Sequence, residues 1–212
     1  MQCQMRTRNG FGVAVLALIA AIATGWAQAA SAQQSAPVRI RGQIEKVDGN
    51  DLTIKSRDGQ ELKVRLADNA RIMAFVPASL SDVKPNAYIG VTAMPQPDGT
   101  QKAMAIHIFL ESMRGTGEGF RPWDKAPGST MTNAAVETTV ASVDGQVLTL
   151  KYKGGEKKVI VPPNTPIVTH AQASKDEIKP GAQIIIVAAQ KQPDGSLTAP
   201  SINVGRGVTP PM

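Results

Sequence analysis

The chain has 212 residues, of which 19% are charged and 4% aromatic, and its formal net charge is +6. This length allows one or two domains. The charge does not predict a nucleic-acid-binding protein, because the basic residues are spread along the chain and usually stand beside acids. Aromatic residues are also too few for a base-stacking surface. Nucleic acid is therefore not an expected partner.

Residues 1–32 have the pattern of a secretory signal peptide, in which two arginines precede a short apolar run and Ala30-Ser31-Ala32 offers small side chains for cleavage. The apolar run is shorter than the ~20 residues that a membrane-spanning helix needs. We expect an N-terminal signal helix, cleavage after Ala32, a polar leader at 33–37 and delivery to the periplasm. Cys3 leaves with the signal, so the mature chain has no thiol and no disulfide. We also expect no membrane span in the mature chain.

Residues 38–109 form the first predicted β-rich unit. Apolar residues at every second position predict half-buried strands, and turns containing glycine separate them. Ser79 or Ser81 could cap a single helical turn that places Leu80 and Val83 on one face. The predicted strands begin near Val38, Leu52, Leu62, Arg71, Tyr88 and Lys102.

Residues 110–135 show neither a helical nor a strand period, and glycine, proline, serine and threonine dominate most of the segment. Such a long connection is expected to be either functional or mobile. It contains the residues that we predict to bind a ligand or partner, because exposed tryptophan and arginine are typical interface anchors. Burying the large apolar surface of a lone tryptophan stabilises a fold more than leaving it in solvent does. We therefore expect Phe120 and Trp123 to fold back between the barrels. The predicted binding residues are Arg114, Phe120, Arg121 and Trp123.

Residues 136–205 repeat the pattern of the first unit at an offset of 95 or 96 positions. This alignment places Val140 at the inward-facing position of Ile44. Residues 206–212 are expected to be an unstructured tail. Two motifs recur: Val47-Asp48-Gly49 as Val143-Asp144-Gly145 (143 − 47 = 96), and Pro97-Asp98-Gly99 as Pro193-Asp194-Gly195.

The repeat predicts an all-β fold of two tandem small OB-like β-barrels, each with one short helical turn. Each copy has about 70 residues, which is near the lower size limit for an independent core. A closed barrel hides the strand edges and fills its interior with the inward side chains. Three meandering strands, a short helix and further strands give an order similar to that of the OB-fold. An SH3-like barrel or a small open sheet is the alternative.

The motifs of residues 40–108 also carry a family resemblance. A strand, Val-Asp-Gly, Leu-Thr-Ile, Leu-Ser-Asp-Val-Lys-Pro and Pro-Asp-Gly follow in this order, which resembles a bacterial exported domain of unknown function. The resemblance implies a small OB-like barrel that often occurs in tandem. The tandem form is similar to alphaproteobacterial proteins that are sometimes labelled metal ABC transporter permeases. A permease needs several spanning helices, which this sequence does not predict.

The sequence does not predict an enzyme. His107 and His170 occupy different positions in the two copies, and neither a Gly-x-Ser-x-Gly motif nor a P-loop is present. We expect no cofactor and no metal. Met73, Met94 and Met104 could gather as copper(I) ligands, but methionine usually fills gaps in a core.

Three functional hypotheses follow. The main one is an exported, non-enzymatic binding or scaffolding protein whose partner is an envelope protein or a glycan. The second is a periplasmic metal-handling protein that uses the three methionines with His107 or His170. The third is an interaction module that docks an envelope protein through residues 110–135.

Overall fold

The computed structural model describes residues 36–142 and 145–211, and this part of the chain is all-β. The predicted signal peptide lies outside the described residues. Within them, no helix is long and apolar enough to cross a bilayer. The strands are β1 (Val38–Asp48), β2 (Asp51–Ser56), β3 (Glu61–Ala78), β4 (Tyr88–Pro95), β5 (Gln101–Ile108), β6 (Gly119–Pro122), β7 (Thr130–Ser142), β8 (Gly145–Tyr152), β9 (Gly155–Val161), β10 (Ile167–Gln172), β11 (Gln183–Lys191) and β12 (Leu197–Gly205). The 3-10 turns are η1 (Leu80–Asp82), η2 (Glu111–Met113) and η3 (Lys175–Glu177).

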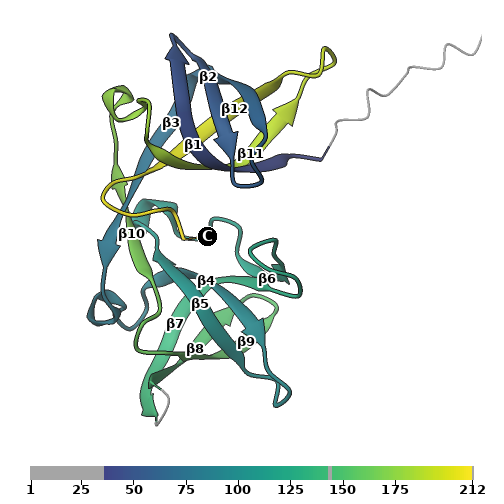
Figure 1. Ribbon diagram of the computed structural model, residues 1–212. Helices are drawn as coiled ribbons and strands as arrows, with labels where there is room; N and C mark the ends of the chain where they lie inside the picture. The colour runs from purple at the N-terminus through teal and green to yellow at the C-terminus, as the bar shows by residue number, and fades with distance from the viewer. Residues whose placement is uncertain (1–35, 143–144, 212) are drawn as a thin grey trace, which may run out of the picture. The chain divides into compact units, whose positions relative to one another are not determined.

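Hydrogen bonding closes two rings of five strands each. The first ring runs β12-β11-β1-β2-β3 and closes through the parallel pairing of β12 with β3. The second runs β5-β4-β7-β8-β9 and closes through the parallel pairing of β5 with β9. Strand β10 connects the rings, because it pairs antiparallel with β3 and parallel with β5. In Figure 1, the blue strands β1 to β3 lie beside the yellow-green strands β11 and β12.

Each ring takes strands from both halves of the sequence. The first ring combines three strands of residues 38–109 with β11 and β12, and the second combines β4 and β5 with three strands from the second half. The expectation that 38–109 and 136–205 would each close a separate barrel is therefore wrong. The last two strands of each copy complete the ring of the other copy: β4 and β5 join the second ring, and β11 and β12 join the first. Neither half of the chain therefore contains a complete ring.

The length of β3 accounts for this exchange. The sequence predicts two strands, near Leu62 and Arg71, but the chain forms one strand of 18 residues. No proline or glycine interrupts it before Pro77. A strand of this length spans roughly 60 Å, so it leaves the first ring before the chain turns at η1. In the second half, Pro162, Pro163 and Pro166 stand between β9 and β10, where proline removes ladder donors.

The two copies are related by an approximate two-fold arrangement around the β3–β10 pair. Phe75 and His170 are equivalent in the repeat (170 − 75 = 95), and they pair directly with each other. The closing contacts are equivalent as well, because Val64 pairs with Leu197 as Val159 pairs with Gln101. This correspondence supports the alignment of the third and fifth strands of the two copies.

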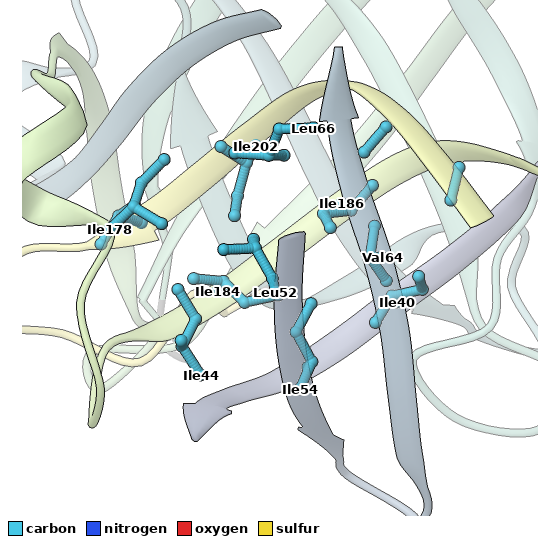
Figure 2. Packing of buried hydrophobic residues seen from close by; sticks show 13 residues of the cluster. Ile40, Ile44, Leu52, Ile54, Val64, Leu66, Ile178, Ile184, Ile186 and Ile202 are labelled. Carbon is cyan, nitrogen blue, oxygen red and sulfur yellow. The ribbon is translucent and has the colours of Figure 1, made fainter. Parts of the chain in front are cut away.

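Each ring surrounds its own apolar core, and each core contains side chains from both halves of the chain. In the first ring, Ile44 and Ile54 pack with Ile184 and Ile202, and Figure 2 shows them converging from β1, β2, β11 and β12. Burying side chains of this size stabilises a fold by about 1.5–3 kcal/mol each. The second core contains Val83, Ile89, Val91, Ala93, Ala103, Ile106, Ala134, Val136, Leu148, Leu150, Val159, Val161 and Ile167.

The first strand of the second copy is displaced from its predicted position. Ile44 pairs with Ile54, and Val136 pairs with the equivalent residue Leu150. Val136 therefore takes the place of Ile44, and the offset in this strand is 92 (136 − 44 = 92). The prediction that Val140 faces inward is wrong, because its side chain is 61% exposed while that of Val136 is buried. The β7–β8 hairpin is four residues longer than the β1–β2 hairpin.

Two segments predicted to lack regular structure are ordered. Residues 110–135 contain η2, β6 and the start of β7, and β6 pairs with β7. In the tail, the Arg206 backbone N–H donates to the Phe75 carbonyl and the Arg206 side chain forms an ion pair with Glu177. Pro210 and Pro211 are buried. Tertiary contacts, which local composition does not reveal, hold both segments.

Candidate functional site

The candidate site is a pocket of about 510 Å³ where elements of both rings meet. Four other hollows on the described surface have volumes between about 220 and 370 Å³. The pocket lies within the 300–1,000 Å³ range that is typical of small-molecule sites. Its wall includes His107, His170, Asn133, Arg121, Trp123 and Met131.

One wall is a row of three residues across neighbouring strands. Gly90 on β4 pairs with His107 on β5 and with Asn133 on β7. A Cβ atom at Gly90 would lie 1.8 Å from His107 Cε1 and 2.7 Å from Asn133 Oδ1. Glycine is therefore needed at this position, because the two polar side chains occupy the space above its Cα atom. Both are almost completely buried, at 3% and 4% exposure.

His170 lies beside His107, with 5.6 Å between the ring centroids. Its Nδ1 is 3.1 Å from the carbonyl oxygen of Ile108. A carbonyl oxygen can only accept, so Nδ1 carries the proton and Nε2 has a free lone pair. Phe109 stacks on the His170 ring at 5.2 Å, and the Phe75 ring lies 4.6 Å away. These aromatic contacts fix the orientation of the imidazole.

Both imidazoles are neutral at pH 7. Burial lowers the pKa of His107 well below its ordinary value, and the positive charge of Arg121, with that of His170 whenever it is protonated, opposes protonation further. Burial also lowers the pKa of His170, although the hydrogen bond to Ile108 opposes this shift. Desolvation penalises the charged form of a histidine. The site therefore presents uncharged ring nitrogens.

Trp123 forms another part of the wall, and two guanidinium groups lie close to its ring. The Arg39 Cζ atom lies 3.6 Å from the ring centroid and the Arg121 Cζ atom 5.5 Å from it. Arg39 also pairs with Asp124 at 2.8 Å. Arg121 donates from Nη1 to the Gly117 carbonyl. Cation–π contacts of this kind hold the indole against β1 and β6.

Several polar atoms in the pocket wall are buried without a hydrogen-bond partner. They are His107 Nδ1, Asn133 Oδ1 and Trp123 Nε1. An unpaired buried polar group costs about 1–3 kcal/mol, so most folded proteins avoid it. Asn133 uses its amide nitrogen to donate to the Thr116 carbonyl, and its oxygen is enclosed in the wall without a partner.

The two copies differ in chemistry at the pocket. Gly90 and His107 pair on β4 and β5, and the equivalent pair on β11 and β12 is Ile185 and Asn203. Phe75 is the counterpart of His170. Ile185, an apolar residue, takes the position in the second copy that Gly90 takes in the first. The space above the glycine therefore exists on only one side of the approximate two-fold axis. Departures from the internal repeat were therefore the sequence signal for this site.

The four predicted binding residues divide into two pairs. Arg121 and Trp123 line the pocket, and Trp123 packs against the small core of Phe75, Met131, Val168 and Ile185. Phe120 is 39% exposed, with Lys157 Nζ 4.5 Å from its ring centroid. Arg114 pairs with Glu111 and donates to the Asn86 carbonyl outside the pocket. The expected folding back is thus confirmed for Trp123 and wrong for Phe120.

Sequence patterns did not predict a role in the site for Asn133, Met131 or Phe109, and they offered His107 and His170 only as possible metal ligands or catalytic groups. Of the three methionines singled out, Met73 lines the pocket, and Met94 and Met104 are not part of its wall. Among the described residues, no group of three histidine, cysteine, aspartate or glutamate side chains is placed to hold a metal ion. Comparison with protein-family models, curated proteins and solved structures finds no match to this chain.

Proposed function

We propose that this chain is an exported, non-enzymatic binding protein whose small-molecule ligand occupies the pocket between the two rings. The lining of the pocket supports this proposal most directly, because apolar and aromatic side chains there surround a few polar groups, as in most small-molecule sites. In the described residues, neither histidine hydrogen-bonds a serine or a carboxylate, and no acid lines the pocket. Binding explains this set of groups better than nucleophilic or acid–base catalysis does.

The strand order of both rings supports an OB-like description of the fold. In each ring three strands form a meander, and the third lies parallel to the last. This order resembles that of the OB-fold, whose barrels hold oligosaccharides or oligonucleotides on one face. The proposed ligand site differs, because it lies where two barrels meet. Export to the periplasm follows from the proposed signal peptide at residues 1–32.

The proposal is tested by native mass spectrometry of the protein lacking residues 1–32, purified from its own envelope fraction without denaturation. Residues 35–212 form one compact unit, so this form retains the site. We expect a bound small molecule that is lost from His107→Leu. The same substitution should leave the stability unchanged or raise it by about 1 kcal/mol, because it removes an unpaired buried nitrogen.

The control is Gln60→Leu, which also replaces a polar side chain with leucine but lies on an exposed turn outside the pocket. This variant should retain the bound molecule. The proposal is wrong if the native protein, given a full set of envelope metabolites, shows no adduct and no shift in its thermal unfolding temperature.

A second candidate function is copper(I) binding, favoured by the position of Met73, His107 and His170 in one pocket. The His170 Nδ1 donates to a backbone carbonyl, the arrangement that usually orients a metal-binding imidazole. Thioether and imidazole groups suit copper(I). Competition with a coloured copper(I) chelator measures the affinity, with His170→Leu expected to weaken binding and Met104→Leu expected to leave it unchanged. Equal affinity in both variants would exclude this site.

A further inference from the structure

We infer that the ligand of this pocket is an organic carboxylate with an apolar body about the size of one aromatic ring. This inference rests on the proposed function and adds the chemical class of the ligand. It follows from the charge, the apolar surface and the hydrogen-bonding groups of the pocket wall.

The charge of the wall is positive. Arg71 and Arg121 line the pocket, and aspartate and glutamate do not. Neither arginine forms an ion pair with an acid in the described part of the chain. Arg121 is half-buried, and burial together with the charge of Arg39 lowers its pKa. A desolvated cation without a counter-charge is costly, so an anion bound beside it offsets the cost.

The position of Arg121 fixes where the anion would lie. Its Nη2 atom and Asn133 Nδ2 each lie 3.3 Å from the point that a Cβ on Gly117 would occupy. Its Nη1 atom already donates to the Gly117 carbonyl. The Arg121 Nη2 and Asn133 Nδ2 donors therefore lie on the same part of the pocket wall, beside Gly117. Arginine binds carboxylates through a planar fork of N–H groups, and this geometry favours a carboxylate over a halide ion.

The apolar part of the wall accounts for the body of the ligand. Phe109, Trp123 and three methionines line the cavity, and the pocket volume of about 510 Å³ exceeds that of a bare carboxylate. Aromatic faces and flexible thioethers favour a ring or a short alkyl chain. The three methionines are Met73, Met113 and Met131.

The polar groups that line the cavity add one more requirement. Asn69, Ser201 and Asn203 lie on the wall, and their side chains can donate or accept hydrogen bonds. A carboxylic acid that also carries a hydroxyl group can pair with such groups, whereas a hydrocarbon cannot.

A matched series of probes tests the inference by isothermal titration calorimetry at pH 7. The probes are 3-(4-hydroxyphenyl)propionate, its uncharged amide and the cationic amine tyramine, which share one phenol ring. We expect the acid to bind about tenfold or more tightly than the amide, as loss of one charge-assisted hydrogen bond predicts, and the amine to bind most weakly. Arg121→Gln should reduce the ratio between acid and amide to about one.

Arg65→Gln is the matched control, since Arg65 pairs with Asp51 on the exposed face of β3 and lies outside the pocket. It should retain the preference for the acid. If all three probes bind equally in the native protein, the pocket binds ligands but the inference of an anionic ligand is wrong. If the acid keeps its advantage in Arg121→Gln, the anion lies elsewhere and the inference is likewise overturned. Absence of binding by any probe, with no bound molecule in the native protein, would reject the proposed function itself.

Discussion

The geometry of the site depends on Gly90. This glycine is required by the lack of space for a side chain, because its backbone does not have a positive φ. Gly90 lies between His107 and Asn133, and its missing side chain leaves the space that both polar groups occupy. In the second copy the same position is Ile185, which is fully buried. The difference of one side chain therefore separates an apolar junction from a polar cavity wall.

We expect Gly90→Ala to destabilise the protein by about 1–3 kcal/mol, the usual cost of overpacking a filled site. The added Cβ would lie 2.2 Å from His107 Nε2, so the imidazole must move. Denaturant unfolding followed by Trp123 fluorescence measures the change. Gly154→Ala is the control, because its nearest contact is the Tyr152 ring at 3.3 Å, which can shift toward solvent. Equal stability of the two variants would contradict this account of Gly90.

At the scale of elements, ion pairs attach the segment between β6 and β7 to β1. Asp124 accepts two hydrogen bonds from Arg41, of 2.7 and 3.1 Å, and pairs with Arg39. Burial alone would raise the pKa of Asp124, but the hydrogen bonds and charges of Arg41 and Arg39 outweigh it and hold the pKa well below its ordinary value. This attachment places Trp123 in the pocket wall.

The depressed pKa of Asp124 predicts a loss of stability in acid. In the unfolded chain the carboxyl binds a proton near pH 4, so the contribution is full above that pH and is lost as pH falls toward the folded pKa. Asp124→Asn should lower the free energy of unfolding at pH 7 by about 1 kcal/mol, a value limited by solvent screening. The two proteins should differ less at pH 2.

The control for this prediction is Asp58→Asn. Asp58 is exposed and lies 3.9 Å from Arg57, so its replacement should change the stability little. Urea unfolding at several pH values measures both variants. An Asp124→Asn protein with the same stability as the native protein at pH 7 would show that these ion pairs do not hold the segment.

For the whole molecule, the exchange of strands makes the two barrels depend on each other. Each ring needs β-strands from both halves of the chain, and each core contains side chains from both. Removing either half leaves both rings open, with unpaired strand edges. The barrels are therefore expected to unfold together in one transition, as a single cooperative unit does.

Expression of residues 36–109 and 110–212 as separate fragments tests this dependence. We expect neither fragment to form a stable monomeric barrel, because each lacks two or three of the five strands of every ring. Mixing the fragments should give a one-to-one complex with the near-ultraviolet circular dichroism of the intact chain. Cooperative unfolding of each isolated monomer would show instead that the halves are independent domains.

The sequence by itself determined the local structure. Alternating apolar residues predicted most strands, and a serine before Leu80 predicted the turn η1, where the Ser79 N–H donates to Asp82. These features depend on residues close together in the chain, so local patterns reveal them. The closed β-barrel was predicted for the same reason, because the repeated inward faces need a common interior. The large apolar area of Trp123 also predicted that it would fold back, and its side chain is partly buried against Met131 and its neighbours.

Only the tertiary structure decided which strands close each ring. Ile89 and Val91 in one copy and Ile184 and Ile186 in the other have nearly the same apolar pattern, so either pair fits either barrel. The length of β3 favours the exchanged pairing, because one strand runs from its pairing with β12 to its pairing with β10, which joins the second ring. That pairing also brings His107 beside His170, 63 positions later in the sequence (170 − 107 = 63). The pocket depends on contacts between distant strands, and no local pattern encodes such contacts.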